Sequence, residues 1–229
     1  TYLARTGTPQ QRDTLAALLW PESDQTSARA ALRRELHALN VSLGQGWLRS
    51  SQELIELESK PHLWMDISQF EQLTADAAHA TAHDTRIQLL TQAVALYKED
   101  FLANFLLADC QEFSDWQHYE ADRLRQQCNN GLETLIRFYS DQNQFDQAIL
   151  HARHRLALDE THEPAHQVLM QLYAYAGQLV AAMRQYEECR RILEQSLNSV
   201  PAAETDKLYE AIRARKLTAP IVATESVVA

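Results

Sequence analysis

The sequence predicts a mostly α-helical protein built from two different parts. Three observations support this fold class. Ala, Leu, Gln, Glu and Arg, which favour helices, dominate the 229 residues, whereas only 5 Gly and 6 Pro are present to interrupt helices. Residues 8–57 have the pattern of two helices followed by two short strands. Further along, a helical pattern repeats with a period of 34 residues.

The first predicted elements are helices with recognisable start and stop signals. The chain opens with the last turn of a helix that ends near Gly7, where a left-handed conformation costs little. A second helix is expected over residues 8–20. The Pro near its start is compatible with a helix, because the first helical turn does not need the missing N–H. A third helix is expected over residues 24–40, with Ser23 or Asp24 as its cap.

Two short β-prone runs follow the third helix. Residues 47–49 and 54–57 flank the polar turn Ser50-Ser51-Gln52, which predicts a β-hairpin. Helix, helix and hairpin is the order of a winged helix-turn-helix. Most of the first helix of that fold, and the strands that usually precede it, are missing here. We therefore expect that the sequence begins inside this domain, with an N-terminal truncation.

The third helix carries a candidate DNA-reading surface. Its apolar residues fall on one stripe spaced for burial, formed by Ala28, Leu32, Leu36 and Leu39. Small and basic residues occupy the other side, namely Ser23, Thr26, Ala30, Arg34 and His37, with Arg33 beside them. Small residues allow close approach to the major groove, and Arg bonds guanine edges or phosphates. Arg49 on the hairpin is a candidate phosphate contact. The alternative is an ordinary amphipathic helix whose arginines only form its solvent-facing side.

The distribution of charge agrees with a DNA-reading unit at the N-terminus. The net charge of the chain is −10. Residues 1–52 carry six Arg and four acidic residues, whereas residues 53–229 carry 15 basic and 27 acidic residues. A slightly basic head on a strongly acidic body is typical of a small DNA-binding unit joined to a part that does not bind DNA.

Beyond Pro61 the chain predicts one helix after another. We expect helices over residues 66–82, 84–97, from about 111, and over 204–213. The apolar segment 98–108 lacks periodicity, which indicates a packed loop. The long helix from residue 111 is expected to bend at Asn129-Asn130-Gly131. Residues 215–229 are interpreted as a tail or linker.

The strongest pattern is the 34-residue repeat, which is typical of tetratricopeptide repeats. The offset superimposes Leu135 on Leu169, Tyr139 on Tyr173, Asn143 on Gly177 and Ala148 on Ala182. Asn143 and Gly177 fall at the turn, where positive φ is tolerated. The two alanines are small enough for paired helices to approach closely. We therefore predict about seven helices over residues 66–214, stacked as antiparallel pairs.

The sequence predicts no catalytic, metal or cofactor site. Three scattered cysteines indicate reduced cytoplasmic thiols, and no apolar run approaches the ~18–20 residues of a membrane helix. The segment His162-Glu163-Pro164-Ala165-His166 matches a zinc-protease pattern. However, Pro164 suits the first turn of a helix, which places His162 in the preceding loop. A metallohydrolase is the weakest alternative.

Several segments resemble the SARP-type bacterial transcriptional regulators. Residues 18–24, 28–29 and 32–33 resemble their winged-helix segment. The start of their bacterial transcriptional activator domain is similar to residues 64–71, and later parts of that domain are similar to residues 97–102, 112–116 and 184–190. The likeness extends over roughly residues 10–214.

The resemblance implies the C-terminal part of an OmpR-type winged-helix domain over residues 1–58 and a bacterial transcriptional activator domain over residues 59–214. Such regulators activate transcription, bind promoter DNA as dimers and contact RNA polymerase. By position, the resemblance implies these recognition-helix residues: Thr26, Arg29, Arg33, Arg34 and His37. We therefore expect a cytoplasmic DNA-binding activator, not an enzyme, whose helical repeats mediate protein contacts. The alternative is a tetratricopeptide-type interaction scaffold without autonomous DNA binding.

Overall fold

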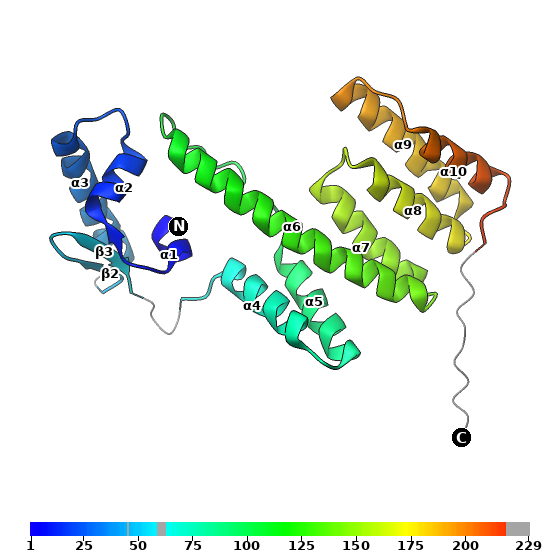
Figure 1. Ribbon diagram of the computed structural model, residues 1–229, viewed down its shortest axis with the longest axis horizontal. Helices are drawn as coiled ribbons and strands as arrows, with labels where there is room; N and C mark the ends of the chain where they lie inside the picture. The colour runs from blue at the N-terminus through cyan, green and yellow to red at the C-terminus, as the bar shows by residue number, and fades with distance from the viewer. Residues whose placement is uncertain (45, 59–62, 219–229) are drawn as a thin grey trace. The chain divides into compact units, whose positions relative to one another are not determined.

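The computed structural model describes residues 1–44, 46–58 and 63–218, which form two compact units (Figure 1). Unit 1 comprises residues 1–65 and 101–123, and unit 2 comprises residues 66–100 and the described residues from 124 onward. The described residues form ten helices and one small sheet, which confirms the predicted fold class. Residues 219–229 of the predicted tail and the predicted boundary at residue 59 lie outside the described residues.

Unit 1 begins with alternating short helices and strands. They are α1 (Tyr2–Thr6), β1 (Gln10–Gln11), α2 (Arg12–Leu19), α3 (Gln25–Leu43), β2 (Leu48–Ser50) and β3 (Leu54–Leu57). The central strand β3 is antiparallel to both β1 and β2. The predicted hairpin is therefore confirmed. The predicted start of the second helix at residue 8 is wrong, because Gln10 and Gln11 extend to pair with β3.

The predicted helix boundaries at Gly7 and Asp24 are confirmed. Gly7 is left-handed with φ of +62° and donates its N–H to the carbonyl oxygen of Leu3, which closes α1. The carboxylate of Asp24 accepts hydrogen bonds from the backbone N–H groups of Thr26 and Ser27 at 3.0 and 3.1 Å. Hydrogen bonding by Ser27 and then Thr26 lowers the pKa of Asp24, so the cap stays ionised.

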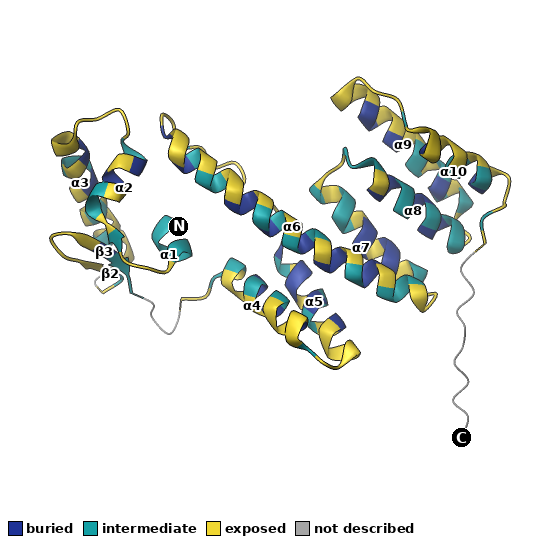
Figure 2. Cartoon of the chain, viewed as in Figure 1, coloured by how far each residue is buried: buried dark blue, intermediate teal, exposed yellow. Residues whose placement is uncertain are grey.

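The core of these first elements lies where α2, α3 and β3 meet. It consists of Leu15, Ala16, Ala28, Leu32 and Ile55. Leu39, predicted to continue the buried stripe of α3, is instead 40% exposed. The helix α2 has 8 residues and α3 has 19, so α2 is too short to cover the second half of α3. Figure 2 shows that the buried residues of α3 are interspersed with exposed ones.

Residues 101–123 complete unit 1. Trp116 makes edge-to-face contacts with Tyr2, at 4.8 Å between ring centroids, and with Phe101, at 5.5 Å. Arg5 donates to a carboxylate oxygen of Glu120 at 2.7 Å. Residues 98–108 contain no helix or strand, which confirms the predicted loop. The predicted packing is wrong for most of it, because Phe101 is buried but Phe105 and Leu106 are 45% and 89% exposed.

Unit 2 is entirely helical in its described part. Its helices are α4 (Asp66–His79), α5 (His83–Leu96), the second half of α6 (Gln111–Asp141), α7 (Phe145–Leu158), α8 (Glu163–Tyr175), α9 (Leu179–Leu197) and α10 (Ala203–Arg213). The seven predicted helices are confirmed, and α7, α8 and α9 pack in succession. The helix α6 is uninterrupted at residues 129–131, where the sequence predicted a bend. There, Gly131 serves close packing, because a Cβ would lie 3.3 Å from Cγ1 of Val94.

The predicted 34-residue register is confirmed in unit 2. Asn143 and Gly177 are both left-handed, with φ of +56° and +74°. The residue after each of them makes the same backbone hydrogen bond. The N–H of Gln144 donates to the carbonyl oxygen of Tyr139 at 2.8 Å, and the N–H of Gln178 donates to the carbonyl oxygen of Tyr173 at 2.7 Å. The two matched alanines, Ala148 and Ala182, are fully buried in one core. None of the described helices has the length and apolar character of a membrane span.

Candidate nucleic-acid interface

A concave surface of about 540 Å³ lies between α3 and the hairpin turn of unit 1. Arg12 of α2 and both Arg29 and Arg33 of α3 line it, together with Leu32 and residues 50–52. Three guanidinium groups on one concave surface create a positive potential, which attracts phosphate groups. The structure therefore brings two of the predicted DNA-binding residues, Arg29 and Arg33, into one site with a third arginine.

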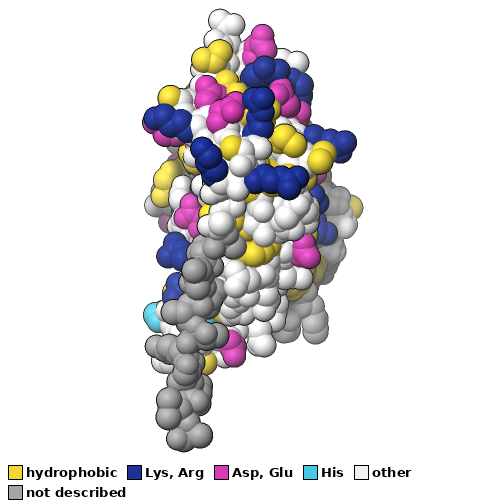
Figure 3. Space-filling model, turned by 90° about the vertical axis from the view of Figure 1, so that its right-hand side faces the viewer, with side chains coloured by type: hydrophobic (Ala, Val, Ile, Leu, Met, Phe, Trp, Pro, Cys, Tyr) yellow, Lys and Arg dark blue, Asp and Glu magenta, His cyan; other side chains and the backbone are white. Residues whose placement is uncertain are grey.

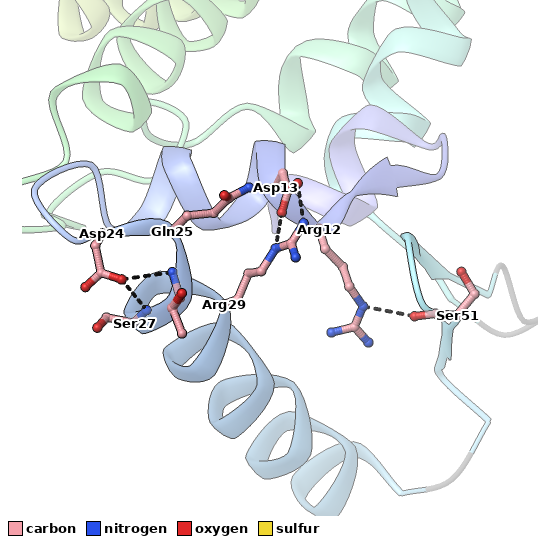
Figure 4. Close-up of polar contacts among 8 residues, drawn as sticks. Arg12, Asp13, Asp24, Gln25, Ser27, Arg29 and Ser51 are labelled. Carbon is pink, nitrogen blue, oxygen red and sulfur yellow. Dashed lines mark hydrogen bonds and ion pairs between the residues drawn. The ribbon is translucent and has the colours of Figure 1, made fainter.

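Arg12 is the member of this site that the sequence analysis missed. Its Nε donates to the carbonyl oxygen of Ser51 at 2.9 Å (Figure 4). Its Nη2 donates to the hydroxyl of Ser50. Its backbone N–H also donates to the carbonyl oxygen of Glu53 at 2.8 Å. Arg12 thus ties the hairpin turn to α2. One feature of the sequence could have indicated Arg12. It lies in the first turn of a helix, where the helix dipole disfavours a positive charge.

Arg29 is held by an acidic neighbour. Figure 4 shows its guanidinium group pointing from α3 toward Asp13 of α2, where two nitrogen atoms donate to the two carboxylate oxygens. Gln25 donates to the same carboxylate at 3.2 Å. The hydrogen bond from Arg29 lowers the pKa of Asp13, and the pairing raises the pKa of Arg29. Arg29 is therefore positioned by Asp13, and its charge is partly compensated.

Arg33 and Arg34 are the uncompensated cations of α3. Both side chains are exposed, and no described carboxylate forms an ion pair with either of them. Thr26, Arg33 and His37 are all exposed. They lie on one stripe of the helix, because Arg33 follows Thr26 by about two turns and His37 follows Arg33 by about one turn. Leu32 is buried beneath this surface and anchors the helix.

Four of the predicted residues do not line the arginine-lined surface, namely Thr26, Arg34, His37 and Arg49. Arg49 is 72% exposed, but its Nη2 lies 2.8 Å from a carboxylate oxygen of Glu58, and Glu56 lies 3.9 Å from its Nη1. This pairing compensates the charge that a phosphate contact would need. His37 lines a separate hollow of about 500 Å³ at the end of α3, beside Asn40.

The segment that matches a zinc-protease pattern has structural roles. Nδ1 of His162 accepts the N–H of Ala165 at 3.2 Å and caps α8. Nε2 of the fully buried His166 lies 2.9 Å from the Glu160 carbonyl oxygen, and its Nδ1 lies 2.7 Å from the Gln185 amide. Both ring nitrogens of His166 are therefore engaged. In the described part of the chain, no three His, Cys, Asp or Glu side chains are grouped to hold a metal ion.

The C-terminal helices of unit 2 present mixed charge. Figure 3 shows basic and acidic side chains interspersed on the face toward α9 and α10. Arg190 pairs with Glu187 at 2.6 Å, Arg191 pairs with Glu188, and Arg213 pairs with Glu210 at 3.3 Å. Each of these three arginines is therefore compensated by an acidic side chain on the same helix.

Comparisons with known proteins identify a family and solved structures with a similar fold. A family model described as "Bacterial transcriptional activator domain" matches residues 65–213. The structure of Mycobacterium tuberculosis EmbR in complex with a low-affinity phosphopeptide is similar, with a TM-score of 0.60 and 19% sequence identity. The similarity covers 93% of this chain and 56% of the EmbR chain, so this chain spans little more than half of that length. At this identity the likeness shows the fold alone. No curated protein sequence matches the chain.

Proposed function

This chain belongs to the bacterial transcriptional activator domain family, and on that premise we propose that it is a DNA-binding transcriptional regulator of the activator type. The family is one of transcription regulators, not of enzymes. Helix α3 would read the major groove, and the hairpin β2–β3 would lie beside it as the wing. Promoter DNA would then be the ligand of unit 1.

The arginine-lined surface between α3 and the hairpin carries this proposal. It combines an exposed helix, a hairpin and three guanidinium groups in the order that a winged helix-turn-helix has. Arg33 and Arg34 would contact the DNA directly, because neither is paired with a described carboxylate. Arg29 would contact the DNA while paired with Asp13. Thr26 and His37 would contact the groove from the stripe of α3 that they share with Arg33.

The helical repeats of unit 2 would mediate protein contacts. Stacked helix pairs expose long continuous surfaces, which suit protein partners. The acidic balance of residues 53–229 also disfavours DNA there. We propose RNA polymerase as one partner and a second copy of the chain as another, in the cytoplasm.

Fluorescence anisotropy with a labelled DNA duplex tests the DNA-binding proposal. The duplex would be selected from a random library by the wild-type protein. Binding to phosphates releases counterions, so the slope of log K against log salt becomes shallower by about 0.9 for each phosphate that the protein no longer neutralises. The double variant Arg33→Gln/Arg34→Gln should therefore bind more weakly, with a slope shallower by about one to two.

Arg190→Gln/Arg191→Gln is the matched control, because it removes two adjacent exposed arginines from α9. It should leave both the affinity and the slope unchanged. Wild-type affinity in the α3 variant, with α3 intact by circular dichroism, would exclude α3 as the reading helix.

A scaffold without autonomous DNA binding is the second candidate. The pairing of Arg49 with Glu58 and of Arg29 with Asp13 favours it, because two of the predicted contacts are already compensated. Under this alternative the wild-type protein should select no duplex from the library, at low salt as well as at high salt.

A further inference from the structure

A second polar hollow lies in unit 2, where the first turn of α5 meets the last turns of α6. Its volume is about 380 Å³, which is in the size range of small-molecule sites. The side chains that define it are His83, Arg86, Thr134, Arg137, Phe138 and Asp141. None of these residues belongs to the candidate DNA surface.

Arg86 and Arg137 are two uncompensated cations on this one hollow. Five other arginines of unit 2 form ion pairs with carboxylates: Arg125, Arg155, Arg190, Arg191 and Arg213. Neither Arg86 nor Arg137 forms an ion pair with any described carboxylate, although both are exposed. Asp141 also lines the hollow, so two guanidinium groups face a single carboxylate there. The hollow therefore has a net positive charge within a chain whose net charge is −10.

Three of the side chains that line the hollow are held by contacts with their neighbours. The ring of His83 packs against Phe138, with 5.0 Å between the centroids. The Thr134 hydroxyl donates to the carbonyl oxygen of Asn130 at 2.9 Å. The close approach of Gly131 to Val94 sets the spacing of α5 and α6 below it. The two arginines are thus carried by two helices in close contact, which favours a preorganised site.

We propose that this hollow binds a small organic phosphate. Guanidinium groups match phosphate oxygens in geometry and charge, and the two in this hollow outnumber its single carboxylate. The apolar faces of His83 and Phe138 would contact the organic part of the ligand. This proposal concerns unit 2 alone and does not depend on DNA binding.

Isothermal titration of the full chain with phenyl phosphate, at constant ionic strength, tests the site. We expect saturable binding with one site per chain, tighter than that of inorganic phosphate because the ring adds apolar contact. Arg86→Gln and Arg137→Gln should each weaken binding about tenfold, as removal of a charged hydrogen bond does. Phe138→Leu should reduce the advantage of phenyl phosphate over inorganic phosphate.

Arg184→Gln is the matched control, because Arg184 is another exposed arginine of unit 2 without a described carboxylate partner. It should bind phenyl phosphate as the wild type does. Equal weakening in this control would indicate adsorption to surface cations and would overturn the site. Absence of wild-type binding would also overturn it, and benzoate binding as tightly as phenyl phosphate would overturn the choice of phosphate. Retained DNA binding in the same preparation would separate these failures from a failure of unit 1.

Discussion

Replacing Ala182 with leucine should destabilise the protein, because this side chain is fully buried in the core shared by α8 and α9. Its exposed fraction is 0%, so the three added carbon atoms have no route to solvent. Overpacking of this kind costs about 1–3 kcal/mol. Each kcal/mol lowers the Tm of a chain of this size by roughly 2–4 °C, so we expect a decrease of roughly 2–12 °C.

Thermal unfolding followed by circular dichroism measures this decrease. Ala148→Leu should lower the Tm similarly, because Ala148 occupies the equivalent buried position one repeat earlier. Ala157→Leu makes the same chemical change at an exposed position of α7 and should leave the Tm nearly unchanged. If Ala182→Leu melts at the temperature of Ala157→Leu, the repeat register derived from residues 135–182 is refuted.

Three other features lead to predictions. Burial raises the pKa of the cysteine thiols, to about 12 for Cys128 and about 11 for Cys189, so a thiol reagent at about pH 8 should label them only in denaturant. Rapid labelling of the native chain would contradict their burial. Burial also lowers the pKa of His151 below 6.5, so the unfolded state binds a proton that the folded state does not. Stability in urea should therefore fall as the pH drops below about 6.5, and a His151→Phe variant with an equally steep decline would show that another group is responsible. Gly177→Asn should be tolerated, since Asn143 has the same left-handed conformation, whereas Gly177→Val should cost about 1–2 kcal/mol in urea unfolding. Equal midpoints for these two variants would mean that the turn relaxes.

The features that could be predicted from the sequence are those that depend on a residue and its near neighbours in the chain. Asp24 caps α3 with its own carboxylate, two and three residues before the groups that it binds. Gly7, Asn143 and Gly177 end helices because their own backbones tolerate positive φ. The hairpin follows from a polar turn between two β-prone runs. In each case the energetically decisive partner lies within a few residues.

The features that could not be predicted depend on partners far along the chain. Nothing near Gln10 and Gln11 marks them as a strand, since the pairing partner is residues 54–55. The pairing of Arg29 with Asp13 spans 16 residues and decides whether a predicted DNA contact is compensated. Leu39 has the spacing of a buried residue, but its exposure depends on the length of α2. Helical periodicity specifies a face and cannot specify how far its neighbour extends.

The 31-residue helix α6 contributes residues up to 123 to unit 1 and residues from 124 to unit 2 without an interruption. Helix formation is cooperative, so loss of helical structure in one half of such a helix weakens the other half. The two units should then unfold in a single coupled transition, with equal calorimetric and van't Hoff enthalpies. A substitution that weakens the repeats would consequently lower the population of molecules with an intact α3. Reduced DNA affinity in such a variant would reflect a shortage of folded protein and would be reversed by low temperature or a stabilising solute, with every arginine of α3 still present.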